Sequence, residues 1–167
     1  YHRYYYDAEN KLTLAETSTD SIHWEKDMRY EYYMHGPLAR TVTGEQLVQG
    51  TDYVYTLQGW IKGVNGINIQ DSSRDAGLDG SLAAGNPNQY IARDAYGYNL
   101  NYFAGDYVPI NNTVNPFPGV SAYLGSEHKP LYNGNISSMA VSLRFPNATS
   151  VQGTQLYNYS YDQLNRI

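Results

Sequence analysis

Three aspartates recur every four residues in a stretch rich in Gly, Asn and Ser: Asp71, Asp75 and Asp79. Ca²⁺ in proteins is bound by oxygen ligands, and carboxylates clustered in a loop are among them. The three aspartates could therefore suggest a calcium site. An EF-hand-like loop, however, carries its ligands at alternate positions, followed by a Gly and a distal Glu, and that spacing is missing here. The sequence therefore predicts solvated loop acids, with no bound metal and no cofactor.

Other side chains that could do chemistry are scattered. The four His residues show no paired spacing for a zinc site, and the absence of Cys excludes thiolate ligands and disulfides. No Ser lies in a nucleophile-elbow context. The Tyr residues could bind sugars through their ring faces, but their spacing suits a ladder that holds a sheet together, and we favour the ladder. We predict that the chain is not an enzyme.

The composition indicates which kind of secondary structure holds the residues discussed above. The chain has 167 residues, with 19 Tyr against 3 Phe and 2 Trp, together with 15 Gly and 7 Pro. Tyr suits a pleated, half-buried surface, and Gly and Pro supply turns, so the composition predicts an all-β fold. The formal net charge is −5 and the Lys and Arg residues are dispersed, so nucleic acid is not expected as a partner. No apolar run is long enough to predict a membrane span.

A seven-residue frame recurs along the chain. Residues 6–12 and 161–167 both have the pattern Tyr-Asp-x-x-Asn-basic-aliphatic, and residues 32–38 and 55–61 fit a looser version with Gly at the fifth position. The frame's residues are Tyr6, Tyr32, Tyr55 and Tyr161 at position one, Asp7 and Asp162 at position two, Asn10, Gly36, Gly59 and Asn165 at position five, and Leu12, Leu38, Ile61 and Ile167 at position seven.

The frame has a physical explanation as a hairpin turn. Gly and Asn adopt a left-handed backbone most readily, and a tight hairpin loop commonly needs one such residue. An Asp that precedes the loop can accept hydrogen bonds from backbone N–H groups further on. Tyr residues alternate upstream of each turn, which places their rings on one face of a strand. We therefore predict repeated antiparallel hairpins, with Tyr32 and Tyr55 partly buried on one face of neighbouring strands.

The frame is interrupted in the middle of the chain. Residues from about 65 to 95 lack periodicity and are expected to form an irregular surface loop. Strands are predicted at residues 96–103 and 107–110. A hairpin is predicted at Asn133-Gly134, the strongest short turn signal in the chain, with strands at residues 129–132 and 136–145. No ordinary helix is expected.

The frame resembles the signature of Rhs/YD-repeat proteins. The resemblance extends to the segments Trp-Glu-Lys-Asp at residues 24–27, His-Gly-Pro-Leu-Ala-Arg at 35–40, and the stretches 49–60, 102–107 and 132–137. These are similar to a branch of very large bacterial proteins exported by the type IX pathway. The likeness runs nearly end to end and is weakest over residues 65–88 and 111–126.

The resemblance implies a fold and a function. Its repeats would form part of a spiral β-sheet that closes as a hollow cocoon, and residues 1–167 would be one segment of a longer shell. Such a shell often encloses a C-terminal toxin domain, so the expected partners are the rest of the shell, that toxin or effector domain and components of the secretion machinery. The expected location is secreted or at the cell surface. The alternative is an adhesin or receptor scaffold that binds glycans or proteins.

The resemblance also raises the question of whether this chain contains a self-cleavage site. Shells of toxin-bearing relatives end in an Asp-dependent cleavage site, usually within Asp-Pro-x-Gly. The segments Asp-Ala-Gly-Leu at residues 75–78 and Asp-Ala-Tyr-Gly at residues 94–97 both lack the Pro. YD-type turns also follow these segments instead of preceding them. We therefore do not expect an autoprotease within this chain.

Overall fold

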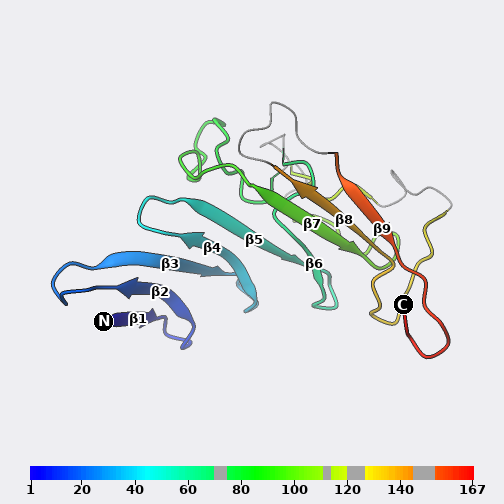
Figure 1. Ribbon diagram of the computed structural model, residues 1–167, viewed down its shortest axis with the longest axis horizontal. Coiled ribbons are helices and arrows are strands. Elements are labelled where there is room, and N and C mark those ends of the chain that lie inside the picture. Colours follow the sequence, from blue (N-terminus) through cyan, green and yellow to red (C-terminus); the bar gives the residue numbers. More distant parts are fainter. Residues whose placement is uncertain (70–74, 111–113, 120–126, 145–152) are drawn as a thin grey trace. The chain divides into compact units, whose positions relative to one another are not determined.

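The structure is a computed structural model, and it describes residues 1–69, 75–110, 114–119, 127–144 and 153–167. It confirms the all-β prediction, since none of these residues lies in an α-helix. Within the described residues, nine antiparallel strands follow one another in sequence order (Figure 1). They are β1 (His2–Tyr6), β2 (Leu12–Thr17), β3 (Glu25–Tyr32), β4 (Leu38–Thr43), β5 (Gln49–Tyr55), β6 (Ile61–Val64), β7 (Tyr96–Asn101), β8 (Ser138–Leu143) and β9 (Gln155–Asn158).

The chain divides into two compact units. The first comprises Tyr1–Tyr53 and Gly77–Asp94, and the second comprises Val54–Ala76 and Ala95–Ile167. In the first unit, β1 to β4 form successive hairpins, and β5 pairs with β4. In the second, β6 to β9 pair in turn. Within the described part of the chain, no helix is both long and apolar enough to cross a membrane.

Four turns share one hydrogen-bond pattern. In each, the N–H of the frame's second residue donates to the carbonyl four residues on, and the fifth residue's N–H donates back to the second residue's carbonyl. The fifth residue has a positive φ each time: Asn10 at 60°, Gly36 at 114°, Gly59 at 83° and Asn165 at 57°. The structure thus places a left-handed residue at the position where the sequence predicted one.

The two aspartates at position two add side-chain bonds to their turns. Asp7 Oδ1 accepts hydrogen bonds from the N–H groups of Glu9 and Lys11, at 2.8 and 2.9 Å. Asp162 Oδ1 repeats the arrangement with Leu164 and Arg166, at 2.8 and 3.0 Å. The backbone and side-chain bonds from Arg166 lower the pKa of the Asp162 carboxyl. Residues at the two ends of the chain therefore form the same local structure.

Strand pairing is also related to the frame. Tyr6 pairs with Leu12, and Tyr32 pairs with Leu38, so positions one and seven face each other across the hairpin. In both hairpins the register shifts immediately before the Tyr. A register shift of this kind marks a β-bulge, which increases local twist.

Several predicted elements are wrong. Residues 107–110 and 129–132 form no strand, Asn133-Gly134 is a bend, and β8 begins at Ser138 instead of residue 136. The backbone of this segment forms hydrogen bonds outside a hairpin ladder: the N–H of Leu131 donates to the carbonyl of Tyr102 at 2.7 Å. The ring of Tyr132 stacks on Phe103, with centroids 4.7 Å apart. These contacts replace the ladder that the Asn-Gly signal predicted.

The segment from 65 to 95 contains no strand in its described residues, as expected of an irregular loop, but part of it is buried instead of lying at the surface. In the first unit, Asp79 and Ile91 are 1% and 3% exposed, and the buried Asn86 amide donates to the carbonyls of Leu78 and Ser81. In the second unit, Ile67 packs in an apolar cluster with Val54, Phe117 and Ala140. Local composition suggested exposure, but Asp79 and Ile67 pack against residues that are far away in the sequence.

The tyrosine ladder departs from expectation as well. Tyr32 is half-buried on β3 and Tyr55 is half-buried on β5, but β4 lies between these strands, so they are not neighbours. On β1, Tyr4 and Tyr6 are 53% and 59% exposed. The expectation that the Tyr alternation lies on adjacent strands is therefore wrong for Tyr32 and Tyr55.

Candidate functional site

The hydroxyls of three tyrosines bind backbone carbonyls at equivalent places. Tyr32 donates to Leu12 and Tyr102 donates to Ile61, and both acceptors occupy position seven of a frame. Tyr161 donates to Ile136, which likewise lies two residues after a left-handed residue, Gly134 at φ 87°. All three bonds are 2.9 Å long. We call this contact the tyrosine tether.

The tether explains why Tyr, instead of Phe, suits these positions. The carbonyl at position seven lies next to the turn, where a bulge interrupts the ladder in the hairpins of Tyr6 and Tyr32. A half-buried ring with a polar tip can pack on the sheet and supply a donor at the same time. Sequence reasoning identified Tyr32 and Tyr161 by their spacing but not Tyr102, and it did not predict what the three hydroxyls bind.

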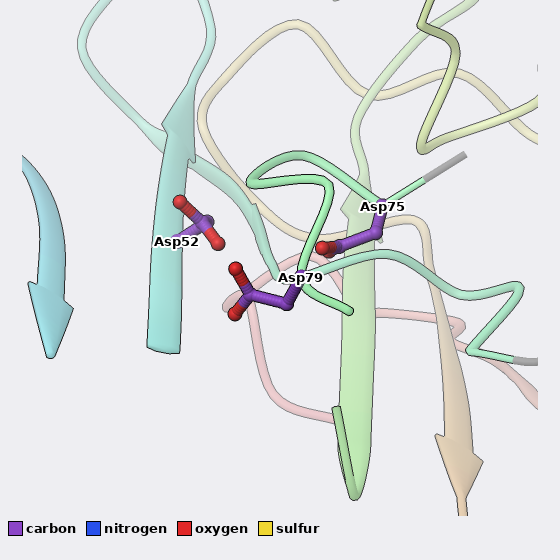
Figure 2. A group of neighbouring side chains, drawn as sticks. All are labelled: Asp52, Asp75 and Asp79. Carbon is purple, nitrogen blue, oxygen red and sulfur yellow. The ribbon is translucent and has the colours of Figure 1, made fainter. Parts of the chain in front are cut away.

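A buried ion-pair cluster lies in the first unit. Arg40 on β4 faces Asp52 on β5 in the strand register, and its guanidinium forms ion pairs with Asp52 and Asp79. Figure 2 shows the carboxylates of Asp52 and Asp79 turned toward each other, one from the strand and one from the loop. The three residues are 5%, 6% and 1% exposed. Burial by itself lowers the pKa of Arg40, but the charges and hydrogen bonds of the two carboxylates outweigh it and raise that pKa.

Two glycines make room for the guanidinium. A Cβ at Gly50 would collide with Arg40 Nη2, and a Cβ at Gly77 would collide with Nη1. A side chain at either position would force the guanidinium to shift, because Arg40 occupies the volume that the side chain would fill. Arg40 can satisfy both acids at once because its planar fork carries donors on several nitrogens.

The cluster corrects the prediction of solvated loop acids. Asp79 is buried against Arg40, and Asp75 is 5% exposed in the second unit, so neither carboxylate is solvated. Asp71 lies outside the described residues. Asp79 and Asp52 share the single positive charge of Arg40, which pairs with both carboxylates. Their arrangement is that of a structural ion pair.

A second buried cluster lies in the other unit. Lys62 on β6 donates from Nζ to both carboxylate oxygens of Asp106, at 2.8 and 2.9 Å, and to Oδ1 of Asn101 at 3.0 Å. Asp106 is held by the N–H of Tyr102, which donates to Oδ2 at 3.0 Å. Lys62, Asn101 and Asp106 are 4%, 1% and 9% exposed. Burial lowers the pKa of Lys62, and the Asp106 carboxylate opposes this shift only in part.

Polar side chains continue this cluster across β7 and β8. Asn101 Nδ2 donates to Ser138 Oγ at 3.0 Å, and Asn99 Nδ2 donates to Asn101 Oδ1 at 3.4 Å. Asn99 Oδ1 accepts from the N–H of Ala140 at 3.2 Å. The largest side chains in the described residues that are almost wholly buried are all polar: Asn65, Asn99, Asn101, Asp79, Ser137, Ser138 and Ser142. Asn99 and Asn101, two residues apart on one face of β7, were the sequence signal for this interior.

The predicted site residues do not converge on one centre. They mark turns, with position-seven residues Leu12, Leu38 and Ile61 opening β2, β4 and β6. The two buried clusters were not predicted, since their partners are 12 to 44 residues apart in the sequence. The sequence matches no known family model, and no curated protein matches it.

Proposed function

We propose that this chain is a structural segment of an Rhs/YD-repeat scaffold, in which repeated hairpins form part of a secreted β-shell around a toxin or effector domain. We also propose that the segment catalyses no reaction. The scaffold proposal rests on one observation: the same turn recurs at Asn10, Gly36, Gly59 and Asn165 with one hydrogen-bond pattern, and a tyrosine tether returns to position seven.

The buried clusters support a mechanical role. An uncompensated buried charge costs several kcal/mol, so a buried ion pair penalises arrangements in which its partners are separated. In the first unit, Asp79 joins the 77–94 segment to β4 and β5 through Arg40. Buried ion pairs of this kind suit a β-shell whose strands and loops must stay in one fixed packing.

The full-length protein that contains this chain provides the test. We expect electron microscopy to show a hollow particle with internal density, and limited proteolysis to spare the enclosed region until the particle is denatured. The matched control is the same downstream region expressed alone, which the protease should cut rapidly. A solid or open particle, with that region cut equally fast in both samples, would contradict the shell proposal.

A scaffold that binds glycans is the second candidate, and the exposed rings of Tyr4 and Tyr6 favour it. Aromatic faces two residues apart can stack on sugars. If this function holds, binding on a glycan array is lost in a Tyr4→Ala/Tyr6→Ala variant and retained in Tyr90→Ala, whose ring is 81% exposed elsewhere in the first unit. Absence of glycan binding by the unaltered protein removes this candidate.

The tyrosine tether makes a separate prediction about stability. We expect Tyr32→Phe to lower the free energy of unfolding by about 1 kcal/mol, because the Leu12 carbonyl loses its donor. Tyr32→Ala should cost about 3 kcal/mol, since the packed ring is lost as well. Denaturant unfolding measures both.

Tyr90→Phe is the control for the tether, because the Tyr90 ring is 81% exposed. It should leave the unfolding midpoint unchanged. Equal midpoints for Tyr32→Phe and Tyr90→Phe would show that the tether adds no stability.

A further inference from the structure

The amine of Lys62 lies between a side-chain amide and a carboxylate in the interior of the second unit. Nζ is 3.0 Å from Asn101 Oδ1 and 2.8 Å from Asp106 Oδ1. An amine, a carboxamide and a proton acceptor are the groups needed to form a new amide bond. All three are held within a region from which water is excluded, since none is more than 9% exposed.

We propose that Lys62 and Asn101 are joined by an intramolecular amide cross-link between β6 and β7, formed with Asp106 as the group that transfers protons. This modification goes beyond a scaffold function and does not depend on it. The chain contains no Cys, so disulfides cannot staple it. An amide between side chains is a covalent staple that needs no oxidant.

The geometry assigns the reacting atoms. A lysine ammonium can only donate hydrogen bonds, so the Asn101 atom that faces it is the carbonyl oxygen, and the electrophilic Cγ lies one bond further on. Asn99 Nδ2 donates to the same oxygen, where negative charge develops during attack. The leaving nitrogen, Asn101 Nδ2, contacts Ser138 Oγ at 3.0 Å.

The step balances without a co-reactant. The Lys62 ammonium gives one proton to the Asp106 carboxylate, and the free Nζ electron pair attacks Asn101 Cγ while the C=O π electrons move to Oδ1. Asp106 then delivers its proton to Nδ2 and takes a second proton from Nζ. The C=O bond re-forms as the Cγ–Nδ2 bond breaks, and ammonia leaves. The product is a secondary amide, with the last proton on Asp106 or on the departing ammonia.

The surroundings favour this chemistry. Burial lowers the pKa of Lys62, which makes the neutral amine more accessible than in water. Fixed positions on two paired strands convert an encounter between side chains into an intramolecular step. Tyr102 fixes Asp106 through its N–H, and the Tyr102 ring packs on Trp60 with centroids 5.0 Å apart.

Mass spectrometry of the purified, fully denatured protein is the direct test. We expect the intact mass to fall below the sequence mass by one molecule of ammonia. Trypsin should fail to cut after Lys62, and fragmentation should identify one branched peptide that contains Lys62 and Asn101. An unmodified mass after prolonged incubation of the folded protein overturns the proposal. A mass lower by one water, with Lys62 joined to Asp106, also overturns it, because Lys62 would then have attacked Asp106 instead of Asn101.

Three variants test the roles. Lys62→Arg and the isosteric Asp106→Asn should both retain the full sequence mass, whereas Lys129→Arg, a change at an exposed lysine, should lose ammonia as the unaltered protein does. Hydrogen exchange reports whether each variant is folded. If Asp106→Asn fails to fold, the mass of the unaltered protein still decides the cross-link. If it folds and loses ammonia at the unaltered rate, the role of Asp106 is wrong.

Discussion

Replacing Arg40 with Ala is expected to lower the free energy of unfolding by about 3–5 kcal/mol, the range for breaking a buried ion pair by removing one partner. The loss is large because the carboxylates of Asp52 and Asp79 stay buried at 6% and 1% exposure without their positive charge. Denaturant unfolding measures the difference. Part of the effect should be recovered at low pH, where protonation neutralises the stranded acids.

A matched control is available on the adjacent strand. Arg29 on β3 forms an ion pair with Glu31 at 3.2 Å, but both side chains are about half exposed, at 49% and 50%. Arg29→Ala should therefore cost at most about 1 kcal/mol, as exposed pairs do. If Arg40→Ala costs no more than Arg29→Ala, water reaches the Asp52 and Asp79 carboxylates and the buried cluster is incorrect.

Gly97→Ala is expected to destabilise the second unit by about 3 kcal/mol, the upper part of the usual range for overpacking. A Cβ at Gly97 would collide with the carbonyl oxygen of Gly66 and lie 2.9 Å from its carbonyl carbon. These are backbone atoms, so they cannot move aside as the end of a flexible side chain could. Thermal unfolding and hydrogen exchange of β7 would measure the effect.

Gly153→Ala tests whether this cost comes from the close approach. A Cβ at Gly153 has no described atom within 4 Å, and this glycine carries no positive φ. The control should match the unaltered protein or slightly exceed it, because Ala restricts the unfolded chain more than Gly does. Equal stability of the Gly97 and Gly153 variants would mean that Gly66 does not approach Gly97 closely.

The all-β class and most of the hairpin turns could be predicted because their causes are local. Asn10 and Gly36 mark the left-handed residue of a turn, and Asp7 bonds N–H groups within four residues. The same local logic failed at Asn133-Gly134. There the preceding segment bonds to Tyr102 instead of forming a strand. A two-residue turn signal carries no information about such a distant partner.

The buried clusters could not be predicted from local pattern. Asp79 lies among residues typical of exposed loops, and only the strand carrying Arg40, 39 residues earlier, makes its burial favourable. Lys62 and Asp106 are 44 residues apart, and each alone would be expected in water. Burial of a charged side chain depends on its partner, and the partner is fixed by the fold.

The three tyrosine tethers share one direction along the chain, whereas the hydroxyl of Tyr33 donates in the opposite direction, to the later carbonyl of Tyr53. In all three tethers the carbonyl acceptor precedes the Tyr donor, as Leu12 precedes Tyr32 by 20 residues. A chain that emerges from a ribosome or an export channel N-terminus first exposes each acceptor before its donor arrives. At these three places, a later Tyr can then bond to a turn that is already complete. Assembly in this order is vectorial, from the N-terminal side toward the C-terminal side.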